Sequence, residues 1–161
     1  MEKAVAAKPF AIRLLEQRKI AHEVFTFDST IRSADEVATV TGMPPGLVYK
    51  TLVVELDPPK GKPYLVMVPS DSEIDLKVLA RALDVKKLRM ASHRDAEKYT
   101  GLQVGGISAL TRANALIPTL IDTRAREHSH ILVSGGQRGV DVRIAVADLV
   151  ALTRATAVRT S

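Results

Sequence analysis

The chain of 161 residues contains no cysteine and no tryptophan, and only 4% of its residues are aromatic. The absence of cysteine excludes disulfide bonds, thiolate zinc sites and a cysteine nucleophile. The scarcity of aromatic side chains argues against a broad surface for stacking nucleic-acid bases. No apolar run approaches the roughly 18 residues that span a bilayer, and the first residues show no signal-peptide pattern. We therefore expect a cytoplasmic protein that does not enter a membrane.

The overall composition is that of a soluble globular protein, with 46% hydrophobic and 25% charged residues. The length suits one compact domain, and no repeat or linker divides it, so we expect a single domain over residues 1–161. The net charge of +5 suits an anionic partner such as nucleic acid, although basic charge also serves solubility. With so few aromatic residues, such a partner would be contacted mainly through phosphate and sugar.

Hydrophobic periodicity and capping signals predict the secondary structure. The predicted helices cover residues 4–18, 34–41 after a Ser33 capping box, 76–83 after Asp75, a short stretch from Ser92 to Gly101, and a last segment after Asp148. The predicted strands cover residues 23–27, 48–56, 64–68, 88–91, 119–122, 131–134 and 140–144. Because hairpins and helices mix without regular alternation, the pattern favours an α+β fold with a mixed, largely antiparallel sheet.

Lys50 does not fit the apolar row of its predicted strand. Side chains alternate along a strand, so Lys50 shares a face with Leu52 and Val54. Desolvating an ammonium group is costly, so a lysine in such a row either reaches water along its own methylenes or lines a cleft. The second possibility would hold a cation at a pocket mouth, ready for a carbonyl, carboxyl or phosphate oxygen. The strand pattern alone leaves both open.

Two stretches are rich in glycine. Residues 101–108 would let a ligand carbonyl approach backbone N–H groups, although glycines also mark ordinary turns and bulges. This stretch is neither a P-loop nor a nucleophile elbow, which makes Ser108 a poor nucleophile candidate. Residues 134–139 form either an anion-binding nest beside Arg138 or a plain hairpin connection.

The remaining titratable residues give weaker signals. His128 and His130 are expected on one side of a strand without a third ligand, so no metal site is predicted. His22 and His93 are isolated and are placed at surface boundaries. Asp141 alternates with Val140 and Val142, and by pattern alone it is expected to be solvated at the surface. No Ser-His-Asp order is evident.

Three segments are informative together: Val48-Tyr49-Lys50-Thr51-Leu52, Thr100-Gly101-Leu102-Gln103-Val104-Gly105-Gly106-Ile107-Ser108 and Val133-Ser134-Gly135-Gly136-Gln137-Arg138-Gly139-Val140-Asp141. Together they resemble the YbaK family of freestanding aminoacyl-tRNA editing proteins, which is related to the insertion domain of bacterial prolyl-tRNA synthetase. The resemblance extends over nearly the whole chain and is closest to the Cys-tRNA(Pro) deacylase branch. It implies one α+β domain whose sheet curls toward a barrel around the substrate pocket.

The resemblance also implies an activity, namely hydrolysis of the ester that joins a wrong amino acid to the 3′ end of a tRNA. It assigns catalytic roles to Lys50, which would hold the substrate, and to Gly105, whose backbone would face the ester carbonyl together with that of Gly106. The substrate-binding residues implied are Phe27, Ser33, Thr51, Gly101, Gly106, Ile107, Ser108, Ser134, Gly135 and Asp141. No metal or cofactor is implied, and a cysteinyl substrate is thought to attack its carbonyl with its own thiol. The expected partners are aminoacyl-tRNA and prolyl-tRNA synthetase.

Three residues depart from the pattern of that branch. Phe27 replaces a tyrosine, Ser33 a phenylalanine, and Ala109 a proline. A pocket discriminates weakly between substrates that differ by one methylene group. With these three departures, the substrate could carry a cysteinyl, an alanyl or another small aminoacyl group. Two further hypotheses remain: a non-catalytic module that binds aminoacyl-tRNA or RNA, and a serine hydrolase that uses Ser108 with Lys50 as its base.

Overall fold

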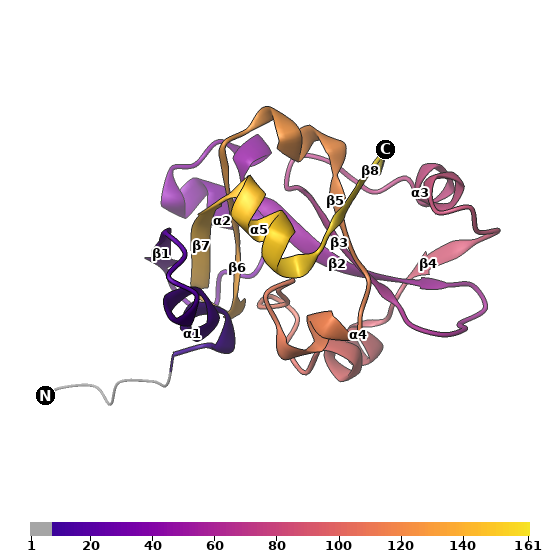
Figure 1. Ribbon diagram of the computed structural model, residues 1–161, viewed down its shortest axis with the longest axis horizontal. Coiled ribbons are helices and arrows are strands. Elements are labelled where there is room, and N and C mark those ends of the chain that lie inside the picture. The colour runs from indigo at the N-terminus through magenta and orange to yellow at the C-terminus, as the bar shows by residue number, and fades with distance from the viewer. Residues whose placement is uncertain (1–7) are drawn as a thin grey trace, which may run out of the picture.

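The computed structural model describes residues 8–161, in which helices and strands follow one another without regular alternation (Figure 1). The α-helices are α1 (Phe10–Gln17), α2 (Ala34–Thr41), α3 (Leu76–Ala82), α4 (His93–Thr100) and α5 (Val146–Thr153). The strands are β1 (His22–Thr26), β2 (Tyr49–Leu56), β3 (Tyr64–Pro69), β4 (Leu88–Met90), β5 (Thr119–Asp122), β6 (His130–Gln137), β7 (Val140–Ala145) and β8 (Thr156–Val158). Short 3₁₀ helices occur at η1 (Pro45–Leu47), η2 (Arg112–Ala115) and η3 (Thr123–Glu127).

The strands of residues 8–161 form two sheets, with the orders β1-β7-β6 and β4-β2-β3-β5-β8. The smaller sheet is antiparallel throughout. In the larger sheet β2 pairs antiparallel with β3 and β4, whereas β3–β5 and β5–β8 are parallel. This confirms the predicted α+β class with a mixed, largely antiparallel arrangement. The two sheets meet at an isolated parallel bridge between Val48 and Leu132, and no closed barrel forms in the described chain, so the expected curl toward a barrel is not confirmed.

Local side-chain signals set several helix boundaries where they were predicted. The Ser33 hydroxyl accepts the Glu36 N–H and donates to the Glu36 carboxylate, both at 3.1 Å, so Ser33 caps the helix as predicted, although the Glu36 carboxylate bonds the hydroxyl instead of the Ser33 N–H of the usual capping box. The helix that follows ends at Gly42, whose φ of 72° is left-handed. Asp75 and Ser92 cap α3 and α4 by accepting backbone N–H groups of the first helical turn.

Other boundaries differ from the prediction. The first helix begins at Phe10, after Pro9, and the predicted helical residues 4–7 lie outside the described residues. The last helix begins at Val146, so Asp148 lies in its first turn. Strand β8 was not predicted, because its three residues carry no periodic signal and are held by parallel pairing with β5. Strand β6 continues through Gly135 and Gly136 with an irregular register, so the predicted hairpin loop is shorter than expected. It begins only at His130, so His128 lies outside it, at the end of η3.

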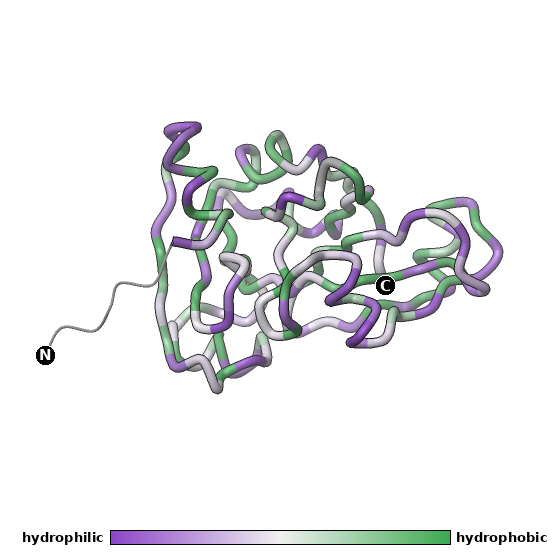
Figure 2. The backbone as a smooth tube through the Cα atoms, turned by 90° about the horizontal axis from the view of Figure 1, so that it is seen from below, coloured by the Kyte–Doolittle hydropathy of each residue, from purple (hydrophilic) through white to green (hydrophobic). Residues whose placement is uncertain are grey.

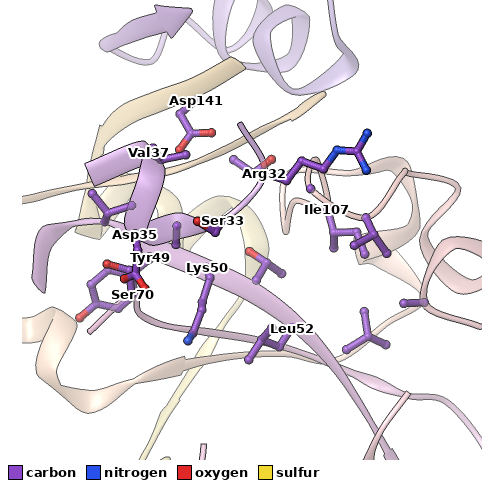
Figure 3. A pocket seen from close by; sticks show the side chains of 18 of the residues that line it. Arg32, Ser33, Asp35, Val37, Tyr49, Lys50, Leu52, Ser70, Ile107 and Asp141 are labelled. Atoms are coloured by element: carbon purple, nitrogen blue, oxygen red, sulfur yellow. The ribbon is translucent and has the colours of Figure 1, made fainter. Parts of the chain in front are cut away.

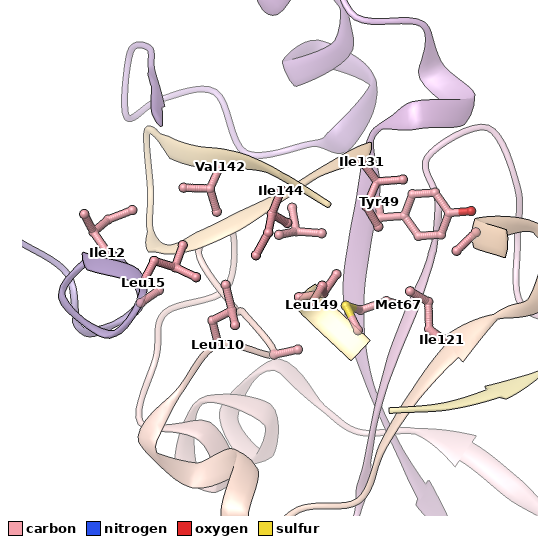
Figure 4. Close-up of a cluster of buried hydrophobic side chains, with 14 residues drawn as sticks. Ile12, Leu15, Tyr49, Met67, Leu110, Ile121, Ile131, Val142, Ile144 and Leu149 are labelled. Carbon is pink, nitrogen blue, oxygen red and sulfur yellow. The ribbon is translucent and has the colours of Figure 1, made fainter. Parts of the chain in front are cut away.

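Helices cover the sheets on several sides. Helix α3 packs through Leu79 and Ala80 on the face of the larger sheet that carries Val54 and Val66. The main core lies between the two sheets, where α1 contributes Ile12 and Leu15 and α5 contributes Leu149 (Figure 4). The hydropathy colouring places hydrophilic residues mainly in the peripheral loops (Figure 2). Burial of the apolar faces is therefore what holds the two sheets together.

The two glycine-rich segments, far apart in sequence, pack directly on each other. A Cβ atom at Gly106 would lie 2.8 Å from the backbone nitrogen of Arg138 and from the carbonyl carbon of Gln137. Nearby, the buried Ser108 hydroxyl donates to the Ser134 carbonyl oxygen at 2.7 Å. The close approach of the backbones at Gly106 excludes any side chain.

We expect Gly106→Ala to destabilise the protein by about 1–3 kcal/mol, because the added methyl group must displace backbone. Gly46→Ala is the matched control, since a Cβ there would meet only the Asp71 carboxylate at an ordinary 3.5 Å. Urea unfolding of both variants measures the difference. Equal stability of the two variants would show that the segments are not packed as described.

Candidate functional site

The candidate site lies where one edge of β2 has no neighbouring strand. β3 pairs with β2 over Tyr49–Val54, but on the other edge β4 pairs only with Val54–Leu56. The Ala91 N–H extends that contact by donating to the Val53 carbonyl, and Val48 bridges to β6. Between these two points, residues 49–52 leave a gap in the described sheet, and a pocket of about 410 Å³ opens there.

The gap explains why the pocket reaches both faces of β2. Lys50 and Leu52 line it from one face, while Thr51 and Val53 line it from the other. The rest of the wall comes from α2 and the segment before it, the end of β3, the start of α4, the first glycine-rich segment and the β6–β7 hairpin (Figure 3). These contributors include Arg32, Ser33, Asp35, Val37, Ser70, Ala91, His93, Val104, Gly105, Ile107, Ser134 and Asp141.

The structure brings part of the predicted site together. The predicted residues that line the pocket are Ser33, Lys50, Thr51, Gly105, Ile107, Ser134 and Asp141. They come from four segments of the chain, at residues 33, 50–51, 105–107 and 134–141. Their convergence on one cavity supports their selection, while the role of each remains a prediction.

Five predicted residues lie outside the pocket wall. Phe27 packs behind it in the apolar cluster of Val37 and Val48. Gly101 ends α4 with a left-handed φ of 72° and lines a different pocket. Gly135 is required by packing, since a Cβ there would lie 2.9 Å from a Val140 methyl group.

The expectations for Gly106 and Ser108 need correction. The Gly106 N–H donates to the Gln103 carbonyl at 2.8 Å and is therefore not free to face a substrate carbonyl. Ser108 is 1% exposed. Its hydroxyl donates to the Ser134 carbonyl and accepts the Leu110 N–H, which leaves it as a structural link. This contact pattern gives no support to a serine hydrolase based on Ser108.

Lys50 is half-buried at the pocket wall. Within residues 8–161 its ammonium group makes no hydrogen bond or ion pair, and in Figure 3 it extends along the face shared with Leu52 and away from Asp141. Of the two sequence interpretations, the pocket position supports the lysine that lines a cleft.

Asp141 is the buried acid of the pocket, with 9% of its surface exposed. It lies on β7 between Phe25 of β1 and Ser134 of β6. Burial raises the pKa of Asp141 to about 7, because the charged carboxylate loses hydration. The prediction of a solvated surface aspartate was wrong, since β7 is covered on both faces: Val142 enters the core and Asp141 faces the pocket.

The hydroxyl groups of the pocket differ in what they are free to do. Ser70 donates to the Pro45 carbonyl at 2.7 Å, and Ser134 accepts the Gly136 N–H at 3.1 Å. The Thr51 hydroxyl is buried without a partner in the described chain. A buried hydroxyl group without a partner is unfavourable, so the Thr51 hydroxyl would gain stability from a hydrogen bond to a ligand in the pocket.

Sequence reasoning missed several wall residues, including Arg32, Tyr49, Ser70 and His93. His93 is exposed at the first turn of α4, so its assignment to the surface was correct, but its place at the pocket rim has no sequence signal. No hydrogen bond joins His93 or Lys50 to a pocket hydroxyl in the described residues. Nor do three histidine or acidic side chains of that part gather closely enough to hold a metal ion.

Comparison with known proteins identifies the family. The model of the aminoacyl-tRNA editing domain matches residues 28–152. The chain belongs to the aminoacyl-tRNA editing domain family. This confirms the resemblance inferred from the three motifs.

Relatives of this editing domain include a protein of Enterococcus faecalis named "Putative Cys-tRNA(Pro)/Cys-tRNA(Cys) deacylase EbsC". The two are 33% identical over 154 residues, which cover 94% of this chain and 92% of the relative. A proline–tRNA ligase of Geobacter metallireducens is 35% identical over 74 residues, which cover 46% of this chain and 12% of the ligase.

The fold of the editing domain also matches the crystal structure of "a putative trans-editing enzyme for prolyl tRNA synthetase", with a TM-score of 0.80 and 24% identity. The match covers 97% of this chain and 99% of the other. None of the helices described here has the length and apolar character to cross a membrane.

The raised pKa of Asp141 predicts a pH dependence of stability. Between its ordinary value of 3.8 and about 7, the folded state binds more protons than the unfolded state. Stability therefore falls as pH rises through this window, by at most about 1.4 kcal/mol per pH unit. Asp141→Asn should remove this fall and be more stable than the wild type at pH 8.

Unfolding midpoints in urea from pH 4 to pH 8 measure the effect. Asp84→Asn is the control, because Asp84 is exposed in a turn with a φ of 56° that asparagine tolerates. A wild-type slope retained in Asp141→Asn would contradict the buried, ligand-facing position of Asp141.

Proposed function

We propose that the protein is a trans-editing enzyme that hydrolyses the aminoacyl ester of a mischarged tRNA, with Cys-tRNA(Pro) as the first candidate substrate. The observation that carries the proposal is the meeting of Lys50, Gly105 and Asp141 around one pocket in a chain of the editing family. Each residue matches one part of an aminoacyl ester: Asp141 matches the cationic amine, Gly105 the carbonyl oxygen and Lys50 a ribose oxygen.

The substrate amine pairs with Asp141 in this proposal. No cation lies within ion-pair distance of the Asp141 carboxyl group among residues 8–161, so its raised pKa follows from burial alone. A bound α-ammonium group would favour the carboxylate and lower the pKa of Asp141. The Asp141 carboxylate, buried in the pocket wall, would then orient the amino acid and so fix the position of its carbonyl group.

The ester carbonyl then faces the Gly105 N–H. No acceptor for this N–H is found among residues 8–161, and Gly105 lines the pocket. A backbone donor aimed at the carbonyl oxygen stabilises the charge that develops there when the carbonyl is attacked. Lys50, whose flexible stem allows its ammonium group to turn toward the substrate, and Thr51 would hold the ribose end.

The described pocket offers no activated nucleophile, which suits a substrate that supplies its own. In a cysteinyl ester the thiol sulfur would form a bond to the carbonyl carbon, the ester C–O bond would break, and the thiol proton would pass to the ribose oxygen. Water would then open the resulting thioester to cysteine. For an aminoacyl group without a thiol, water would attack the ester directly.

Amino-acid selection would depend on Ser33 more than on the other two departures. Ser33 lines the pocket with a short polar side chain already engaged in the capping box. Phe27 and Ala109 lie outside the wall in apolar clusters and act on the pocket only through packing. An alanyl group is therefore the alternative substrate. The relationship to a proline–tRNA ligase supports prolyl-tRNA synthetase as a partner.

Lys50→Met should lower kcat/KM for deacylation by about 100-fold or more, because it removes a charged substrate contact while keeping the length of the side chain. Lys62→Met, in the exposed loop between β2 and β3, is the control for loss of one positive charge. Release of labelled amino acid from mischarged tRNA measures both. Unchanged turnover in Lys50→Met would remove its assigned role.

A panel of cysteinyl-, alanyl- and seryl-tRNA on different tRNA bodies should show hydrolysis of at least one small aminoacyl ester, with cysteinyl-tRNA(Pro) fastest. Preference for the cysteinyl ester over the seryl ester would support attack by the substrate thiol, because only sulfur is a good nucleophile without a base. Tight, salt-sensitive tRNA binding with no hydrolysis would instead identify a non-catalytic module.

A further inference from the structure

The segment that carries Gly105 is a tight turn. The Gly106 N–H donates to the Gln103 carbonyl at 2.8 Å, which closes a four-residue turn with Val104 and Gly105 in its centre. Gly105 has a φ of +94°. A positive φ at the third position is required by a type II turn and is absent from a type I turn.

The orientation of one peptide group distinguishes these two turn types. Turns of types I and II begin and end at similar positions. Between the two types, ψ of the residue before the central peptide differs by about 150°, and φ of the residue after it differs by about 170°. The central peptide, which joins Val104 to Gly105, is thus turned over between them. Its C=O and N–H point in opposite directions in a trans peptide, so the turn type decides on which side the Gly105 N–H emerges.

Two side chains from other elements hold this turn. Arg138 of the β6–β7 hairpin donates from Nε to the Val104 carbonyl oxygen at 2.8 Å. Glu97 of α4 accepts the Val104 N–H on Oε2 at 2.8 Å. Arg138 is not among the residues that line the pocket, whereas Val104 and Gly105 are. Because the C=O and N–H of a trans peptide point in opposite directions, a Val104 carbonyl held by Arg138 directs the Gly105 N–H away from Arg138.

We propose that Arg138 is a positioning residue for ester hydrolysis, which holds the Val104–Gly105 peptide so that the Gly105 N–H faces the substrate carbonyl, and that Glu97 supports it from α4. This inference rests on the proposed function and adds to it the group that aims the carbonyl donor. It also gives the arginine of the second glycine-rich segment a role other than an anion-binding nest.

Arg138→Met should lower kcat by about tenfold to a hundredfold and change KM by less than about threefold, because a misdirected donor fails only where charge develops in the transition state. Arg143→Met is the matched control: it removes one half-buried arginine from the same hairpin without touching the turn. Unfolding curves check that both variants are folded.

Glu97 gives an independent arm of the experiment. Glu97→Leu should lower kcat in the same way, and Glu97→Gln should restore it, because the amide oxygen can still accept the Val104 N–H. This pair tests whether holding the turn affects kcat even if Arg138→Met does not fold. Loss of activity in Glu97→Gln equal to that in Glu97→Leu would overturn the support from α4.

Backbone NMR shifts of Val104 and Gly105 measure the turn without substrate. We expect them to move in Arg138→Met and to stay at wild-type values in Arg143→Met. Retained kcat with unmoved shifts would overturn the proposal. A raised KM with weaker salt dependence and retained kcat would also overturn it, because Arg138 would then be a phosphate contact. If the wild type hydrolyses no ester of the panel, the proposed function fails, and the NMR shifts alone decide whether Arg138 holds the turn.

Discussion

The candidate site depends on a break in strand pairing. Strand β2 is paired with β3 along one edge, but within residues 8–161 its other edge has backbone pairing only near Val48 and from Val53 onward. A continuous sheet would have filled the space beside residues 49–52 with another strand. Because it does not, side chains from both faces of β2 reach one cavity, and Lys50 and Thr51 can serve the same ligand although they point in opposite directions.

The wall opposite β2 is held by contacts between the two glycine-rich segments. Gly106 allows the backbones to touch, Ser108 bonds to Ser134, and Arg138 bonds to Val104. Several residues that look like substrate contacts in the sequence are thus occupied in building the wall. The same packing leaves Gly105 as the glycine that faces the cavity.

Electrostatics complete the pocket. Asp141 is buried deeply enough for its pKa to rise to about 7, and Lys50 lies in the same cavity without forming an ion pair with it. A cationic side chain and a buried acid that share a cavity without pairing leave space for a ligand that carries a partner for each. An aminoacyl ester, with a cationic amine beside polar oxygens, has this character.

Much of the local structure was determined by the sequence itself, because caps, turns and strand alternation are short-range properties. The capping box at Ser33, the helix stop at Gly42 and the β2–β3 pair follow from neighbouring residues, and the three motifs together sufficed to recognise the family. The tertiary structure alone decided that Asp141 is buried, that the Ser108 hydroxyl is bonded to the Ser134 carbonyl, and that β8 exists. Each of these depends on residues distant in the chain, whose contacts alternation and capping do not encode.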